Sequence, residues 1–320
     1  MGERRADDVV IAFLFPGQGA QHAGMLAALP DREPSAAVLR TVSEVLGRDV
    51  RELDGPDVMT DTVAAQLGLL TVGVATAALL TADGIRPNAV AGHSIGAFAA
   101  AVVAGVLTLE EATDAVRIRA EGMRDLYPRG FGLLALLGAR VTDAERLTDA
   151  VREGDDLFVA MENAEDQVVL AGSEAAFERA RATAPRFGFR EARRLEVAVP
   201  SHCALMAPVA DAVADRLREV PVRRPTVRYV AAMTARTAPT ADAVLADLAG
   251  GVAHRVRWRD ATDLLAELGA TVVAQLPPGH TTAALFSTAH PSVPVVALGD
   301  SAYDEGLARL RITMERTARS

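Results

Sequence analysis

The sequence Gly92-His93-Ser94-Ile95-Gly96 follows a short apolar run, residues 88–92, and opens a segment rich in small residues, 95–105. This order predicts a strand, a tight turn and a closely packed helix, because glycines let the chain reverse within a few residues. A serine on such a turn projects its hydroxyl from the top of a sheet, where the next helix also aims its N-terminal N–H groups. The context favours Ser94 as a nucleophile over a small residue in a crowded turn.

Apolar runs that suit strands alternate with helix-like segments along most of the chain. Residues 9–15 read as the first core strand, and the Ala/Leu/Val-rich segment 63–80 reads as a buried helix. Thr108 and Glu111 form a capping-box pattern that starts a helix over residues 108–126. The alternation favours an α/β fold.

The pattern changes between residues 130 and 199. Strand, helix, strand, strand, helix and strand are expected over residues 133–138, 143–151, 157–161, 167–171, 173–184 and 192–197. This βαββαβ order is typical of a ferredoxin-like unit. We therefore predict a large α/β-hydrolase-like domain from residues 1–128 and 200–320, with a ferredoxin-like subdomain, 129–199, inserted between its halves.

Composition excludes several classes of function. No stretch approaches the roughly 20 uninterrupted apolar residues of a membrane span, so a soluble, cytoplasmic protein is expected. The chain carries 42 acidic and 33 basic residues, a net charge of −9, which disfavours nucleic-acid binding. A single cysteine, Cys203, excludes an internal disulfide, and no two histidines stand at i, i+4, so no metal site is expected.

A serine nucleophile needs a base. His202, in Val199-Pro200-Ser201-His202-Cys203, follows the last predicted strand of the subdomain, where the chain returns to the main sheet. That place favours it as the base. Other histidines remain open alternatives on this reasoning alone: His22, His254, His280 and His290.

Three segments occur in order along the chain: Phe15-Pro16-Gly17-Gln18-Gly19-Ala20-Gln21, the Ser94 motif, and Val199-Pro200-Ser201-His202-Cys203-Ala204-Leu205-Met206. Together they resemble the malonyl-CoA:acyl-carrier-protein transacylase family over residues 10–298. Within that family, the stretches 96–102, 253–258 and 276–280 are similar to the epsilon subunit of malonate decarboxylase, a transacylase that charges the decarboxylase's own carrier protein with malonyl.

The resemblance implies a ping-pong reaction through a Ser94 acyl-enzyme, with His202 as base and no bound cofactor. Malonyl-CoA and a phosphopantetheine-type thiol of an acyl carrier protein would be the substrates. It also implies partner subunits of a malonate decarboxylase. Further residues receive roles by resemblance: the backbone N–H groups of Gln18 and Ile95 as oxyanion donors, the backbone carbonyl of Arg257 as the group that orients His202, and Gln66 and Asn163 as pocket residues.

Three arginines lie on the predicted helix 108–126, and their helical neighbours differ. Arg117 and Arg124 have acidic residues one turn away, whereas Arg119 neighbours Ala115, Val116, Gly122 and Met123 on the apolar face. An unpaired arginine there is costly unless an anion meets it, and a guanidinium grips a carboxylate with two hydrogen bonds. Arg119 is therefore predicted to bind the malonyl carboxylate, and the resemblance implies the same residue.

Some features depart from the family or have plainer interpretations. Ala97 stands where the family usually has glutamate, and Ala232 where asparagine is common. His93 is expected to pack at the turn, and Cys203 to be a small buried hydrophobe. A solvated charge run is favoured over a docking surface for four arginines: Arg186, Arg190, Arg193 and Arg194.

Three other functions stay open on the sequence alone. The first is the same transacylase chemistry serving fatty-acid or polyketide synthesis. The second is a serine hydrolase such as a thioesterase, and the third is an inactive docking module. Arg119 argues against the second, and the intact Ser94 and His202 argue against the third.

Overall fold

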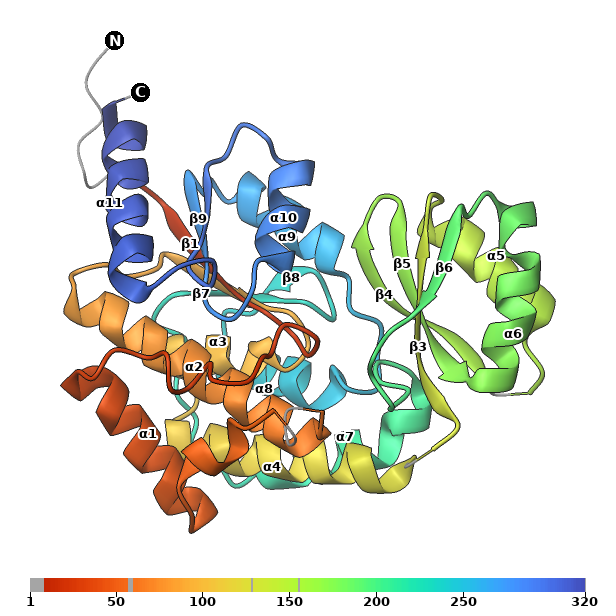
Figure 1. The fold of residues 1–320 in the computed structure, drawn as a ribbon, viewed down its shortest axis with the longest axis horizontal. Helices are drawn as coiled ribbons and strands as arrows, with labels where there is room; N and C mark the ends of the chain where they lie inside the picture. Colours follow the sequence, from red (N-terminus) through yellow and green to blue (C-terminus); the bar gives the residue numbers. More distant parts are fainter. Residues whose placement is uncertain (1–8, 57–59, 128, 155, 320) are drawn as a thin grey trace.

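A six-stranded sheet forms the centre of the larger part of the molecule (Figure 1). The computed structural model describes residues 9–56, 60–127, 129–154 and 156–319. The strand order is β10-β9-β1-β2-β7-β8, parallel except for the antiparallel edge strand β8. The bounds are β1 Ile11–Phe15, β2 Ala89–Gly92, β7 Arg228–Ala231, β8 Arg236–Thr237, β9 Val272–Gln275 and β10 Val295–Ala297.

Helices cover this sheet, so its central strands are buried on both faces. Every residue of β1 is buried, which is why its sequence is a continuous apolar run rather than an alternating one. The helices of this part are α1 Glu33–Leu46, α2 Thr62–Ala82, α3 Gly96–Val103, α4 Leu109–Leu126, α7 Ala207–Leu217, α8 Ala241–Gly250, α9 Trp258–Glu267, α10 Thr281–Ala289 and α11 Tyr303–Arg319.

Helix α2 confirms the buried helix predicted over residues 63–80. Its 21 residues are long and apolar enough, by length and composition, to cross a membrane. However, 94% of its most apolar window is buried inside the protein, where it packs against α1, α3 and α4. A core helix buried on all sides has the same composition as a membrane span.

A second sheet, with strand order β4-β5-β3-β6, lies beside the first and is antiparallel throughout. Its strands are β3 Phe131–Leu137, β4 Leu157–Ala164, β5 Gln167–Ser173 and β6 Glu191–Arg194. Helices α5 Val141–Val151 and α6 Glu174–Thr183 cover the face away from the main sheet (Figure 1). The βαββαβ order confirms the predicted α/β fold with an inserted ferredoxin-like subdomain, while the predicted domain limits stay a prediction.

Strand β6 ends at Arg194, before residue 197, where the sequence predicted its end. The Arg194 guanidinium donates to the backbone carbonyls of Leu195 and Val197, so these groups do not need a strand partner. The predicted start of α4 is confirmed: Thr108 and Glu111 exchange both hydrogen bonds of a capping box.

Candidate active site

The turn between β2 and α3 holds Ser94 in a left-handed conformation, with φ of 55°. A non-glycine residue adopts this region at a cost, and such strain clusters at functional sites. The two flanking glycines are required by close packing. A Cβ on Gly92 would lie 2.1 Å from the nitrogen of Ala97, and one on Gly96 would lie 2.3 Å from the Phe15 carbonyl oxygen. The turn therefore presses against the end of β1.

His202 lies in hydrogen-bond contact with Ser94, with 2.8 Å between Nε2 and Oγ. Its Nδ1 lies 2.6 Å from the Gly251 carbonyl oxygen, and its backbone N–H donates to Val252 over 2.7 Å. A carbonyl oxygen can only accept, so the Nδ1 atom carries the proton and Nε2 offers a lone pair to the serine. Gly251 directly follows α8, so its carbonyl lies at the negative end of that helix.

The surroundings keep this imidazole neutral. Burial, and next the positive charge of Arg119, lower the pKa of His202 to about 3. A neutral imidazole at physiological pH can accept the serine proton. The contact with Ser94 and the neutral form of the imidazole are what the predicted role of base requires.

The predicted role of Arg257 was wrong. The carbonyl that holds His202 belongs to Gly251, while the backbone N–H of Arg257 donates to the Ala232 carbonyl and its guanidinium pairs with Asp260. Helix α8 ends at Gly250, and this end places the next carbonyl against the imidazole. The Gly250-Gly251 pair signals this helix end, but the sequence does not show which carbonyl the imidazole will meet.

The four alternative histidines have other partners. His22 and His254 are exposed and lie against backbone carbonyls of their own neighbours, Ala23 and Gly250. His280 lies against Asp300, and His290 lies against Asp263.

Arg119 reaches Ser94 from helix α4. Its side chain is only 2% exposed, Nη1 donates to Gln66 Oε1, and Nη2 donates to Ser94 Oγ over 3.2 Å. Burial lowers the pKa of Arg119 to about 10, so it stays charged at neutral pH. Within the described part of the chain, no carboxylate pairs with it, in contrast to Arg117 with Asp114 and Arg124 with Asp125.

Gln66 and Asn163 both lie near the nucleophile, in different ways. Gln66, on α2, is fully buried and contacts Arg119 and the sulfur of Met123. Asn163, at the end of β4, lies 3.0 Å from His93 through Oδ1 and Nε2. The His93 ring also packs edge-on against Trp258. Asn163 therefore joins the inserted subdomain to the turn that carries Ser94.

The backbone N–H groups of Ile95 and Gln18 remain candidates for the oxyanion donors. In the ranges that the structure covers, no protein acceptor takes the N–H of Ile95 or of Gln18. Gly17 lies so close to the turn that a Cβ there would meet His93 Nδ1 at 2.6 Å, which brings the Gln18 loop beside Ser94. Preorganised donors next to a nucleophile are what a developing oxyanion requires.

Ser94, Arg119 and His202 line one cavity of about 20 Å³. Its other walls are largely apolar and include Ala97 and Ala232. That space is about the size of one water molecule.

The sequence reasoning missed one buried carboxylate in the cavity wall. Asp247 on α8 accepts hydrogen bonds from the hydroxyl of Tyr229 at 2.8 Å and the backbone N–H of Met233 at 3.0 Å. Burial raises the pKa of Asp247 to about 6. Its signal in the sequence was a lone charge inside the apolar run 243–249.

Other sequence-based interpretations can be compared with the structure. Cys203 is buried, its thiol donates to the Pro200 carbonyl, and burial raises its pKa to about 12, as for a small core residue. Arg190, Arg193 and Arg194 each pair with an acidic residue of the subdomain. Among the residues that the structure describes, no three His, Cys, Asp or Glu side chains are arranged to hold a metal ion.

Comparison with known proteins places this geometry among acyl-transferring enzymes. Residues 12–298 match the family described as acyl transferase domain. The malonyl CoA-acyl carrier protein transacylase of Haemophilus influenzae is 33% identical over 278 residues, covering 84% of this chain and 88% of that protein. The same enzyme from Coxiella burnetii superposes with a TM-score of 0.90 at 29% identity, covering 96% of this chain and 98% of that one.

A third relative was solved as a complex. It is a malonyl-transacylase bound to its type II PKS acyl-carrier protein, similar to this chain with a TM-score of 0.89 and 29% identity over 95% of this chain and 99% of that one.

Proposed function

Because this chain belongs to the acyl transferase domain family, we propose that it moves a malonyl group from malonyl-CoA, through an ester on Ser94, to the thiol of an acyl carrier protein. The chain is an acyltransferase; the acyl group, the acceptor and the residue roles are the proposal. No bound cofactor takes part, and coenzyme A and the carrier's phosphopantetheine-type group enter as parts of the substrates. A cytoplasmic location belongs to the same proposal.

The first half-reaction uses groups that already lie in contact. His202 Nε2 takes the proton of Ser94 Oγ as the oxygen attacks the thioester carbonyl carbon. The N–H groups of Ile95 and Gln18 stabilise the oxyanion. The C–S bond then breaks, and the imidazolium returns its proton to the thiolate of coenzyme A. A carrier thiol reverses these steps and takes the acyl group.

One observation supports malonyl as the acyl group: Arg119, a buried guanidinium with no carboxylate partner among the residues that the structure describes, donates a hydrogen bond to the candidate nucleophile. In a malonyl ester the free carboxylate is two bonds from the ester carbonyl carbon. A carboxylate at Arg119 supplies the partner that the buried cation lacks. An acetyl group offers nothing to this cation.

The relatives favour a carrier of fatty-acid or polyketide synthesis. They are named as malonyl CoA-acyl carrier protein transacylases and polyketide synthases. The expected similarity to the malonate decarboxylase epsilon subunit has no support among them. The role in fatty-acid or polyketide synthesis, kept as an alternative on the sequence alone, is therefore the better one.

The test is acceptor choice. The protein and malonyl-CoA are mixed with one phosphopantetheinylated carrier at a time: a carrier of fatty-acid synthesis, of polyketide synthesis or of malonate decarboxylase. The mass of each carrier is then measured. We expect malonylation of a fatty-acid or polyketide carrier, absent with Ser94→Ala. Charging of the decarboxylase carrier alone would reverse the choice of pathway. Release of free malonate with every carrier would instead support the serine hydrolase.

A further inference from the structure

The inserted subdomain holds the chain segment that supports His202. Ala160 of β4 accepts a hydrogen bond from the N–H of Val256 at 2.9 Å, and the N–H of Glu162 donates to the Val256 carbonyl at 2.8 Å. Segment 251–257 therefore begins with the carbonyls of Gly251 and Val252, which hold His202. It ends beside β4, with which Val256 forms a parallel bridge. Val252 and Val256 on this segment also line the catalytic cavity.

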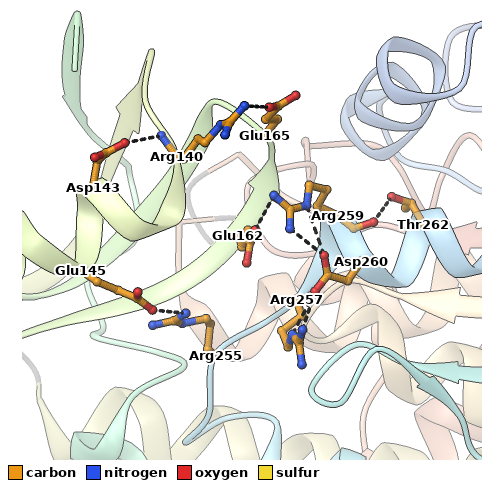
Figure 2. A network of polar contacts seen from close by, with 10 residues as sticks. All are labelled: Arg140, Asp143, Glu145, Glu162, Glu165, Arg255, Arg257, Arg259, Asp260 and Thr262. Carbon is orange, nitrogen blue, oxygen red and sulfur yellow. Dashed lines mark hydrogen bonds and ion pairs between the residues drawn. The ribbon is translucent and has the colours of Figure 1, made fainter. Parts of the chain in front are cut away.

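Two ion pairs cross between the subdomain and this region, and Figure 2 shows both. Glu162 on β4 pairs with Arg259 at 2.8 Å, and Glu145 on α5 pairs with Arg255 at 2.7 Å. The two pairs differ in the burial of the carboxylate: the Glu162 side chain is 5% exposed and the Glu145 side chain 44%, while the two arginines are about equally exposed, at 31% and 33%. An exposed pair contributes little to stability, whereas removing one partner of a buried pair leaves an uncompensated charge.

Glu162 is also next to the residue that contacts the nucleophile turn. Asn163 lies against His93, the neighbour of Ser94 in the chain. The end of β4 therefore touches the support of the base through residue 162 and the turn of the nucleophile through residue 163. A shift of this strand would move the two supports relative to each other.

We propose that Glu162 and Arg259 are a positioning pair for acyl transfer: their ion pair, buried at Glu162, fixes β4 against the start of α9, directly after segment 251–257, and so keeps the His202 imidazole aligned with Ser94. The inference rests on the proposed acyl-transfer reaction but not on the choice of acyl group or carrier. Neither residue touches the reacting atoms. Arg259 also pairs with Asp260 at 2.9 Å, so it keeps a partner when Glu162 is neutralised.

The experiment compares Glu162→Gln with its matched control Glu145→Gln, both in the full chain. The measured quantities are kcat and KM for malonyl transfer, per folded protein, and the pH profile of kcat/KM. Misalignment of a base by a fraction of an ångström slows the chemical step, so Glu162→Gln should lower kcat about tenfold or more while KM changes by less than about threefold. Its acidic limb should move to higher pH, because looser packing lets water stabilise the imidazolium.

Glu145→Gln should leave kcat, KM and the pH profile at wild-type values. Arg259→Lys keeps the charge and should retain more activity than Arg259→Ala. This comparison tests the ion pair independently if Glu162→Gln does not fold. Equal behaviour of the Glu162 and Glu145 variants, with an active wild type, would overturn the positioning pair alone. A wild type that transfers no acyl group would instead contradict the proposed function.

Discussion

Arg119 and Ser94 are in hydrogen-bond contact, with Nη2 of the guanidinium 3.2 Å from the serine hydroxyl oxygen. One residue comes from the middle of α4 and the other from the turn between β2 and α3. The contact puts a buried cation within the length of one short acyl group from the nucleophile. A malonyl carboxylate bound to both Nη atoms of Arg119 would replace the Ser94 hydroxyl as the acceptor of the Nη2 hydrogen bond.

Replacing Arg119 should change which acyl group is accepted. Arg119→Ala removes a charge-assisted bidentate contact to a carboxylate, a loss of about 2–3 kcal/mol or about 30-fold to 150-fold in malonyl loading. Acetyl loading has no such contact and should fall far less. Rates of acyl-enzyme formation with malonyl-CoA and acetyl-CoA measure the difference. The control is Arg117→Ala on the same helix, whose guanidinium pairs with Asp114 and Glu121. Equal losses for both thioesters would remove the assignment.

The pH dependence of loading should report the unusual environment of His202. Burial, with the charge of Arg119 second, lowers its pKa to about 3. The imidazole therefore stays neutral as the pH falls from 8 to 5, and kcat/KM for loading should not decline there through its protonation. Arg119→Gln removes one cause of the low pKa, so its acidic limb should move to higher pH. An acidic limb near pH 6.5 in the wild type would contradict this environment.

Asp247 should make the fold less stable as the pH rises. Its folded pKa of about 6 lies above 3.8, the ordinary pKa of an aspartate side chain. The protonated carboxyl is favoured by folding, so this contribution is fully present below about pH 4 and is lost as the pH rises through 6, about 3 kcal/mol in all. Asp247→Asn lacks this loss. The free energy of unfolding of this variant, measured with denaturant, should therefore rise relative to that of the wild type as the pH increases from 4.5 to 7.5.

The matched variant for that comparison is Asp242→Asn, an exposed carboxyl on the same helix. The free energy of unfolding of Asp242→Asn should keep a constant difference from that of the wild type over the same pH range. The same trend in both variants would mean that burial of Asp247 is not its cause.

The nucleophile turn should tolerate no side chain at Gly96. A Cβ there would meet the Phe15 carbonyl oxygen at 2.3 Å, and both are backbone positions that cannot move independently. Gly96→Ala should therefore cost more than about 4 kcal/mol or prevent folding, as thermal unfolding would report. Gly122→Ala on α4 is the control, because its Cβ would meet the Val209 side chain, at 3.3 Å or more, rather than backbone, and alanine favours helix. A stable, active Gly96→Ala protein would contradict the described packing of the turn.

Much of the site was predictable because local sequence patterns determine it. The turn at Ser94 needs glycines on both sides, and α4 begins with a capping box that both side chains complete. Arg119 was singled out by its apolar neighbours one turn away, and in the structure it is buried. Each of these features depends on residues within a few positions of one another.

The features that the sequence missed depend on distant segments. Gly251 rather than Arg257 holds His202. The pair Gly250-Gly251 is a helix-stop signal, and α8 does end at Gly250. Which carbonyl meets the imidazole, however, depends on how two segments far apart in the sequence pack together. Asp247 pairs with Tyr229 across two elements, which no local pattern reveals. Strand β6 ends early because one arginine side chain satisfies the carbonyls that follow it.

The central claim is that Ser94 carries the acyl group, and intact mass of the protein tests it most directly. Incubation with malonyl-CoA should add one malonyl group to the wild type, and peptide mapping should place it on Ser94. Ser94→Ala should stay at its unmodified mass, and acetyl-CoA should label the wild type far less. A malonyl adduct that persists in Ser94→Ala, or no adduct on a folded wild type with either thioester, would contradict the account.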